Sequence, residues 1–361
     1  MEGTERPVRR HPRQRIRFTR RFYIVVGSVA IVILVIILIA ALSGGGSAEF
    51  ESAVSTIGSQ NQGELYQLKV NELGAVMVLE YHKIGEEGRW SRTPENFRAD
   101  LEFLYNEGYR CVSMKDYATN NIDVELGYTP VVLTFDDSDP SQFKYVEEDG
   151  QVVIDPRCAM GVMQQFASDY PDFNITATFY VEPRLFGQDE YIEEKLQYLV
   201  DSGFDIGNHC VNHPQLSELD DNAVLEEITG NIEAVQAYLP DYEEASLALP
   251  YGSEPANTAL LAGGSLNGIT YNFVASLLVG ANPAPAPCDS SFDPLRLPRV
   301  QALDPSLDTG DSGIYAWIQY FMENPERRYR SDGNVDIVTV PKHMIDRIDQ
   351  AKLGDKKLNS Y

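Results

Sequence analysis

The sequence predicts an α/β domain built on a parallel sheet and preceded by one transmembrane helix. Three observations lead to this fold class. Short apolar runs alternate with amphipathic segments from about residue 73 to residue 341, a stretch of 21 uncharged residues precedes them, and polar residues directly follow several of the apolar runs. Strands that alternate with helices in this order pair in parallel, and such sheets collect their functional residues at the carboxyl ends of the strands.

The transmembrane helix is predicted over residues 22–42, FYIVVGSVAIVILVIILIAAL. About 20 apolar residues, each rising about 1.5 Å, span the roughly 30 Å hydrocarbon core of a bilayer. Eight arginines precede this stretch, and positively charged flanks stay on the cytoplasmic side. We therefore expect residues 1–21 to form a basic cytoplasmic arm, and the rest of the chain to lie outside the cell, anchored to the cell membrane. A cleaved signal peptide is the alternative, although its apolar region is normally shorter.

The remainder of the chain is strongly acidic. The formal net charge is −25, and because residues 1–42 carry +6, the remainder carries −31. Such a body repels phosphates, which argues against a nucleic acid as a partner. Gly, Ser, Gln and Glu are frequent in residues 43–72, so we expect a flexible stalk there. The main domain is then expected over residues 73–345 and a short tail over residues 346–361.

Predicted strands and helices alternate along the main domain, and each strand is a short apolar run bounded by turn residues. The strands are expected over 75–82, 130–137, 175–181, 204–209, 246–252 and 335–341. The helices are expected over 93–108, 189–203 and 217–239. Thr93 and Pro94 form a typical start for the first helix. Residues 138–161 are expected to leave the sheet as an excursion with a hairpin turn at 147–151.

Polar side chains lie at the ends of several predicted strands. They are His82, Asp136, Asp137, His209 and Tyr251. Because the carboxyl ends of parallel strands meet at one edge of a sheet, these side chains are expected to converge. The sequence therefore predicts a functional site at that edge.

A pair of histidines is the clearest signal of metal chemistry. His209 and His213 are two of only five histidines in the chain and lie four residues apart. Two imidazoles and one carboxylate suit a catalytic zinc ion, with open positions left for water and substrate. A helix start with two surface histidines is the alternative. Cys210 is expected to point away from the face that the two histidines share, and the four cysteines show no CxxC pair and no indicated disulfide.

The two adjacent aspartates can take different tasks, because neighbouring side chains on an extended strand point in opposite directions. One of Asp136 and Asp137 would bind a cation while the other handles a proton, and a simple strand-ending turn is the alternative. His82 would suit a general acid that protonates a leaving group, unless it is a structural histidine. Tyr251, in the LPYG turn, offers an aromatic wall and backbone N–H groups for an oxyanion.

Two arginines and a late histidine are weaker candidates. Arg296 and Arg299, in LRLPRV, would each orient an aspartate or contact substrate, or else lie on the surface beside a strand. His343 is expected to take no part in the chemistry.

The motifs TFDD, GNHCVNHPQLSEL and LPYG, in this order, resemble the polysaccharide deacetylase family, carbohydrate esterase family four. The resemblance implies that Asp137, His209 and His213 hold a divalent metal ion, with Zn²⁺ expected. It also implies that Asp136 is the general base and that Tyr251 lines the acetyl pocket. The implied reaction hydrolyses N-acetyl groups of an extracellular acetylated amino-sugar polymer, poly-N-acetylglucosamine or a peptidoglycan-like glycan, and releases acetate.

The chain departs from the family pattern at three places. Ala248 stands where the family often has an arginine, so the partner of the base is missing or is supplied by Arg296 or Arg299. Of these, Arg299 is included among the predicted catalytic residues. Ser138 replaces a common glycine, and the usual late catalytic histidine is not found.

The early motif EYHKIG resembles the circularly permuted branch of the family, which acts on poly-N-acetylglucosamine. This resemblance implies that His82 is the general acid and that the fold is a distorted (β/α)7-type barrel. Two alternatives stay open: an esterase that removes O-acetyl groups from a cell-wall glycan, and a glycan-binding module with a decayed active site.

Overall fold

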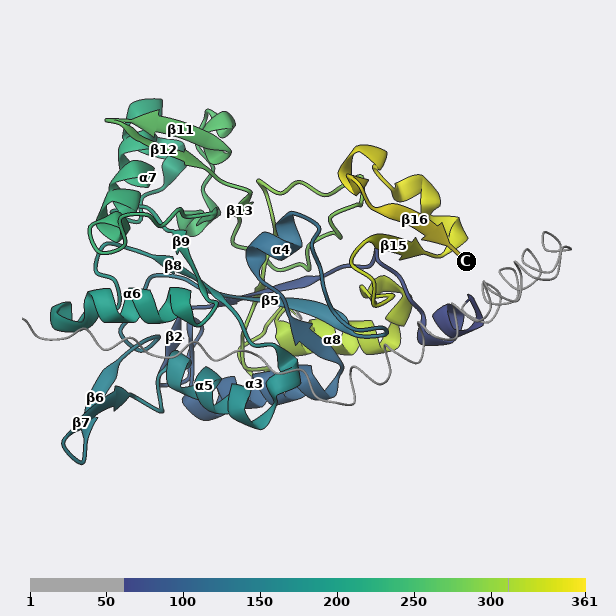
Figure 1. Cartoon of the computed structure of the whole chain (residues 1–361), viewed down its shortest axis with the longest axis horizontal. Helices are drawn as coiled ribbons and strands as arrows, with labels where there is room; N and C mark the ends of the chain where they lie inside the picture. The colour runs from purple at the N-terminus through teal and green to yellow at the C-terminus, as the bar shows by residue number, and fades with distance from the viewer. Residues whose placement is uncertain (1–61, 311) are drawn as a thin grey trace, which may run out of the picture. The chain divides into compact units, whose positions relative to one another are not determined.

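A parallel sheet runs through the centre of the structure, a computed structural model that describes residues 62–310 and 312–361 (Figure 1). Along the sheet the strands follow the order β13, β10, β9, β8, β5, β1 and β14, and β4 pairs with β5 at the side. The bounds are β1 Met77–Tyr81, β4 Tyr109–Cys111, β5 Thr129–Phe135, β8 Thr178–Val181, β9 Asp205–Asn208, β10 Ser246–Ala248, β13 Ala275–Leu277 and β14 Val300–Gln301. All pairings between these strands are parallel, as the alternation of strands and helices predicts.

The two ends of this sheet meet, so the sheet curls into a barrel-like ring. Leu277, the last residue of β13, forms a parallel bridge with Leu297, just before β14. The backbone N–H of Leu278 donates to the carbonyl of Leu297 at 2.8 Å. Since β14 also pairs with β1, the ring contains the seven strands of the sheet path, with β4 outside it.

Five of the six predicted strands lie in the central sheet, and the sixth does not. The apolar run at 335–341 does form β15 Ile337–Val340, but β15 pairs with β16 Lys357–Ser360 in a separate two-stranded sheet. The ring is completed instead by β13 and β14. These strands have only three and two residues, and so short a segment has no periodicity from which a strand could be predicted.

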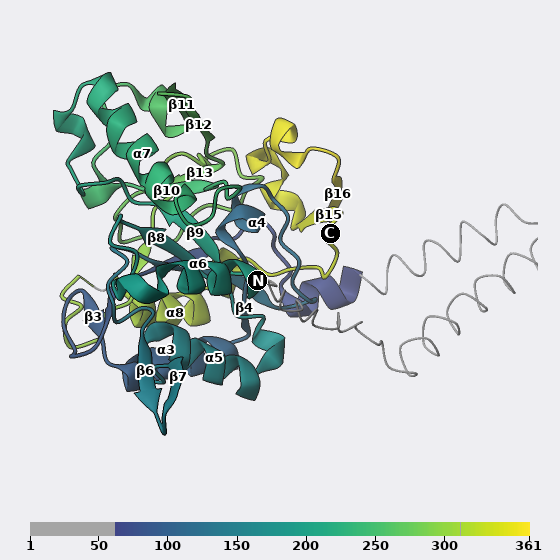
Figure 2. The ribbon, with the colours of Figure 1, turned by 60° about the vertical axis from the view of Figure 1, so that its left-hand side comes forward.

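Helices pack against the central sheet and its edges (Figures 1 and 2). They are α3 Pro94–Asn106, α4 Met114–Ala118, α5 Ala159–Asp169, α6 Ile192–Asp201, α7 Asp221–Gln236 and α8 Ile314–Glu323. The start of α3 is the predicted one, because the side chain of Thr93 accepts the N–H of Asn96 at 3.0 Å and Pro94 is the first helical residue. In both views α3 and α5 lie side by side, and α7 lies against the hairpin of β11 Gly263–Leu266 and β12 Ile269–Asn272.

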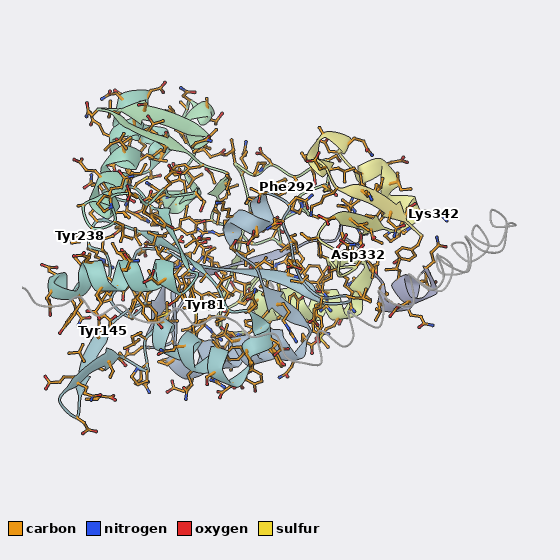
Figure 3. The ribbon with its side chains drawn as sticks, in the orientation of Figure 1. Tyr81, Tyr145, Tyr238, Phe292, Asp332 and Lys342 are labelled. Atoms are coloured by element: carbon orange, nitrogen blue, oxygen red, sulfur yellow. The ribbon has the colours of Figure 1, made fainter. Side chains whose placement is uncertain are left out.

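Side chains alternate along the central strands, and this alternation builds the site. Leu79 and Tyr81 of β1 pack into the apolar cluster that includes the residues of α3, α5 and α8 (Tyr81 is labelled in Figure 3). Val78 lies on the opposite face of the strand, which the ring encloses. Because the period of a strand is two residues, Glu80 follows Val78 on the enclosed face. In the same way Asp136 lies on the face of β5 that carries Val132.

The excursion after β5 is a hairpin, as predicted. It consists of β6 Tyr145–Glu148 and β7 Gln151–Ile154. Asp149 and Gly150 form its turn with φ of 52° and 76°, the left-handed values that such a two-residue turn requires. A second short pair, β2 Lys83–Ile84 and β3 Ser91–Arg92, follows β1 at the edge of the sheet where the polar residues lie.

The packed body extends beyond the predicted limits at both ends. Residues 1–21, 22–42 and most of the stalk lie outside the described residues, and no helix among the described ones is long and apolar enough to cross a membrane. Residues 62–68, predicted as stalk, are helical. Leu65 and Val70 are buried, because their apolar side chains have a partner surface on the body. The predicted tail is also part of the body, since β16 forms backbone hydrogen bonds with β15.

Candidate active site

A pocket of about 520 Å³ opens at the carboxyl ends of the central strands. Its lining residues are Glu80, His82, Lys83, Trp90, Asp136, Asp137, His209, His213, Leu249, Tyr251 and Val279. All the polar residues predicted to converge at the strand ends are therefore in one pocket. Their meeting at this edge follows from the parallel order of the strands.

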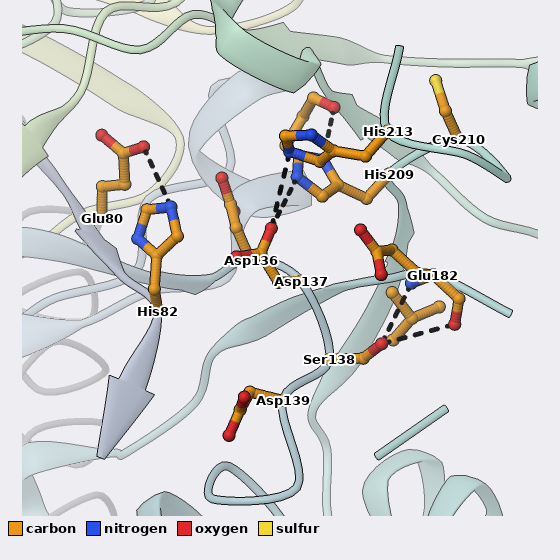
Figure 4. Close-up of polar contacts among 12 residues, drawn as sticks. Glu80, His82, Asp136, Asp137, Ser138, Asp139, Glu182, His209, Cys210 and His213 are labelled. Carbon is orange, nitrogen blue, oxygen red and sulfur yellow. Dashed lines mark hydrogen bonds and ion pairs between the residues drawn. The ribbon is translucent and has the colours of Figure 1, made fainter. Parts of the chain in front are cut away.

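A tight turn after β5 directs Asp137 toward the two histidines (Figure 4). Asp137 Oδ1 lies 3.3 Å from His209 Nε2 and 3.6 Å from His213 Nε2. Asp137 and Ser138 have φ of 75° and 43°, a backbone conformation that non-glycine residues adopt at a cost. Ser138 secures the turn despite replacing glycine, because its Oγ accepts the backbone N–H of Glu182 at 3.1 Å.

His209 directs its Nε2 atom toward this cluster. Its Nδ1 lies 2.8 Å from the carbonyl oxygen of Ala248. Since a carbonyl only accepts hydrogen bonds, Nδ1 must carry the hydrogen, which leaves Nε2 unprotonated in the neutral ring. Nε2 is buried and has no hydrogen-bond partner. Ala248, which stands where the family often has an arginine, thus orients His209 through its backbone carbonyl.

The loop that carries both histidines is held by polar side chains. The carboxylate of Glu227 accepts the backbone N–H groups of Val211 and Asn212 at 2.9 and 2.8 Å. Asn231 donates to the carbonyl of Cys210 at 2.8 Å. Cys210 is fully buried in an apolar cluster and points away from the histidine rings in Figure 4, as expected.

Asp137, His209 and His213 fit a divalent metal ion. One atom from each lies within 4.8 Å of the atoms from the other two. Three ligands of the N,N,O type with an open position are typical of catalytic zinc, and the unpartnered Nε2 of His209 is explained by such an ion. Burial lowers the pKa of His213, which keeps this imidazole in the neutral form that a metal requires.

Arg299 lies beneath the pocket, fully buried, and clamps Asp136. Its Nη1 donates to Asp136 Oδ1 at 2.8 Å and its Nη2 donates to Asp136 Oδ2 at 2.7 Å. Burial alone would raise the pKa of Asp136, but the guanidinium outweighs it and holds this pKa well below its usual range. Of the two candidate arginines, Arg299 is therefore the one that binds Asp136. Arg296 instead pairs with Glu254 at 2.8 Å and is half exposed.

Glu80 is a buried residue of the site that sequence reasoning missed. Its Oε1 lies 3.2 Å from Arg299 Nη2 and 3.9 Å from His82 Nε2 (Figure 4). Burial raises the pKa of Glu80 to about 7, although Arg299 opposes the shift. Glu80 could have been found from the sequence. It is a carboxylate in an apolar strand, on the face of Val78 and His82, and a buried carboxylate requires a partner.

His82 lies beside the aspartate pair, at the wall of the pocket opposite the histidine loop (Figure 4). Polar atoms of Glu80, His82 and Asp136 lie within 4.8 Å of one another. Burial lowers the pKa of His82, although Asp136 and Asp137 oppose the shift. The ring of Trp90, a second residue that the sequence did not single out, contacts the imidazole with a centroid distance of 4.8 Å.

Tyr251 lies at the mouth of the pocket in the short 3-10 segment Pro250–Gly252. Its φ is 58°, and its ring contacts the His213 ring at a centroid distance of 4.5 Å. The side chain is 66% exposed, so it is free to contact a ligand. His343 is exposed and lies outside this pocket.

Residues 124–271 match the family model described as polysaccharide deacetylase. The resemblance to the polysaccharide deacetylase family is confirmed. The matched segment contains these predicted site residues: Asp136, Asp137, His209, His213 and Tyr251. His82 and Arg299 lie outside it, yet the fold brings both to the same carboxylate.

Several solved structures are also similar to this chain. The Streptococcus pyogenes deacetylase PplD, in complex with acetate, is 18% identical over 68% of this chain and 98% of its own, with a TM-score of 0.49. IcaB from Ammonifex degensii is 19% identical over 68% of this chain and 97% of its own, with a TM-score of 0.47. BC0361, a polysaccharide deacetylase from Bacillus cereus, is 20% identical over 63% of this chain and 65% of its own, with a TM-score of 0.47. No curated protein matches the sequence significantly.

Zn²⁺ binding is expected to depend on His213. Replacing His213 with alanine removes one of three ligands, so the Zn²⁺ affinity is expected to fall by about 100-fold or more. Isothermal titration of the metal-free protein measures this affinity. The matched control is His343→Ala, because His343 is exposed and lies outside the pocket. Equal affinities in His213→Ala and the unchanged protein would contradict the assignment.

Proposed function

We propose that the chain is a membrane-anchored, metal-dependent polysaccharide deacetylase that hydrolyses N-acetyl groups of an extracellular amino-sugar polymer. The observation that carries the proposal is the convergence of two groups of side chains on one pocket. Asp137, His209 and His213 face one side of the pocket, and Asp136 and His82 face the other. The membrane anchor rests on the sequence of residues 22–42 alone.

Asp137, His209 and His213 would hold a divalent cation, and Zn²⁺ fits their donor set. Such an ion supplies positive charge that acidifies water and polarises the carbonyl of an amide. The backbone of Tyr251, in its left-handed conformation beside His213, is placed to contribute an N–H group to the developing oxyanion.

Asp136 would accept the proton of the attacking water. Each carboxylate oxygen of Asp136 uses one lone-pair site on Arg299 and keeps another for the water. Because Arg299 lowers the pKa of Asp136, this carboxylate is a weak base that stays ionised. It can take the proton only from a water that has itself been made acidic, which is consistent with a metal-dependent reaction.

His82 would deliver a proton to the nitrogen that leaves as an amine. Its pKa is lowered by burial, so the imidazole would first take up the proton that Asp136 has accepted from the water and would then give it to the nitrogen; polar atoms of Asp136 and His82 lie within 4.8 Å of one another. Glu80, 3.9 Å from His82 Nε2, would stabilise the transient positive charge on the ring. Water and amide thus become acetate and an amine, with Asp136 and His82 at the two ends of the proton transfer.

The order of the site residues along the chain supports the permuted branch as part of the proposal. His82 follows β1, which precedes the segment that matches the family model. It nevertheless lies beside Asp136, as the early motif EYHKIG implies. The alternative of a decayed binding module was motivated by Ala248 in place of arginine. Arg299 now supplies a guanidinium to Asp136, which removes that motive.

Asp136→Asn is expected to abolish turnover while the metal still binds. The amide cannot accept the proton, so the rate of acetate release from N-acetylglucosamine oligomers should fall by at least about 100-fold. Zn²⁺ content, measured by elemental analysis, should stay at the level of the unchanged protein. Asp201→Asn, an exposed aspartate on α6, is the control. Loss of metal from Asp136→Asn would mean that the two aspartates have exchanged roles, and faster release from O-acetyl polymers would favour the esterase.

His82→Ala is expected to lower kcat far more than it changes KM. A general acid contributes about 100-fold to 10,000-fold to the chemical step and little to substrate binding. Steady-state kinetics on the same oligomers separate the two constants, and circular dichroism checks that the variant is folded. An unchanged kcat would make His82 a structural residue.

A further inference from the structure

Trp90 places a large aromatic ring at the mouth of the pocket without any catalytic task of its own. It is 41% exposed and lines the same pocket as Tyr251. An exposed aromatic surface at the edge of a polar pocket marks a place where a ligand packs.

Trp90 and Tyr251 flank the two halves of the proposed chemistry. The Trp90 ring contacts His82 at a centroid distance of 4.8 Å, and the Tyr251 ring contacts His213 at 4.5 Å. One ring thus lies beside the residue that would protonate the leaving nitrogen, and the other lies beside a residue of the metal cluster. A ligand whose amide is held between these groups has its nitrogen side next to Trp90.

The loop that carries Trp90 is fixed by a buried ion pair. Arg92 Nε donates to Asp100 Oδ2 at 3.0 Å, and both residues are almost fully buried. Tyr315 donates to the same carboxylate at 2.7 Å, and Glu87 accepts from Arg92 Nη1 at 2.8 Å. These contacts order the loop before any ligand binds. Binding of a ligand to Trp90 would therefore cost little free energy for ordering the loop.

Backbone hydrogen bonds hold the same loop from the other side. The N–H of Lys83 donates to the carbonyl of Trp90 at 3.1 Å, and the N–H of Gly85 donates to the carbonyl of Arg92 at 2.7 Å. These bonds tie the backbone of Trp90 to β2, which directly follows His82. The indole and the imidazole therefore lie next to each other in one wall of the pocket.

We propose that Trp90 is the sugar-stacking residue of this site and that it binds the ring of the amino sugar whose acetyl group is removed. The C–H face of a pyranose ring is apolar and packs on an aromatic face, whereas a small acetylated compound has no such face. Trp90 therefore selects a glycan chain over small acetyl esters and amides. This inference rests on the proposed function, because the sugar is placed by the amide that it carries.

Fluorescence provides a test that needs no catalysis. The chain has two tryptophans, Trp90 and Trp317, and Trp317 lies outside the pocket. In an Asp136→Asn background, Trp317→Phe leaves Trp90 as the only tryptophan. Titration with N-acetylglucosamine oligomers is expected to change its emission saturably. The matched variant Trp90→Phe, in which only Trp317 reports, is expected to show no saturable change. The absence of a change in the Trp317→Phe protein would overturn the proposal.

Kinetics provide the second test. Trp90→Ala is expected to raise KM for the oligomers about tenfold, the effect of one aromatic contact, with a smaller effect on kcat. The ratio of kcat/KM for oligomers to kcat/KM for a small aryl acetate should fall by a similar factor, and Trp90→Tyr should restore most of it. Tyr320→Ala, which removes a ring of similar exposure outside the pocket, is the control.

The outcomes separate this proposal from the proposed function. If the unchanged protein releases no acetate from any polymer, the deacetylase function fails, and the fluorescence titration still decides whether Trp90 binds sugar. If the protein is active and Trp90→Ala leaves KM and the substrate ratio unchanged, the function stands and the stacking role of Trp90 is wrong.

Discussion

The buried guanidinium of Arg299 connects the fold to the chemistry. Its Nε donates to the carbonyl of Leu278 at 2.9 Å, next to β13, while its two terminal nitrogens reach Asp136, Thr134 and Glu80. Arg299 precedes β14, where the ring of strands is closed by very few residues. One side chain therefore ties the closing segment to the ends of β1 and β5. Removing one partner of such a buried pair typically costs about 3–5 kcal/mol, which makes this contact important for the ring as well as for the site.

The same contact explains how two adjacent carboxylates come to differ. Asp136 lies on the enclosed face of β5, where both of its oxygens bind Arg299. Asp137 begins a turn with left-handed backbone, so its carboxylate points to the two histidines instead. Arg299 holds Asp136 ionised and in place. Asp137 lies with His209 and His213 and stays available to a cation. The division of tasks is thus a consequence of strand alternation followed by a strained turn.

Much of this site follows from the sequence, because strand ends are readable from apolar runs. The runs before His82, Asp136 and His209 predicted that these residues meet at one edge, and they do. Arg299 was included among the predicted catalytic residues, but whether it or Arg296 binds the base stayed open, because β14 is too short to show a period and the register of the chain at this point is set by its neighbours. The apolar run at 335–341 was wrongly predicted to belong to the central sheet, because the short strands that complete the ring could not be recognised in the sequence. Trp90 carried no signal in the sequence, since the position of its loop depends on the buried contact between Arg92 and Asp100.

Anomalous diffraction at the zinc absorption edge, from crystals grown with Zn²⁺, tests the central claim most directly. The account predicts one zinc peak about 2.0–2.2 Å from a carboxylate oxygen of Asp137 and from the Nε2 atoms of His209 and His213. Both oxygens of Asp136 should remain on Arg299 in the same crystals. A zinc peak on Asp136, or a zinc ion that leaves Asp137 outside its coordination sphere, would contradict the account.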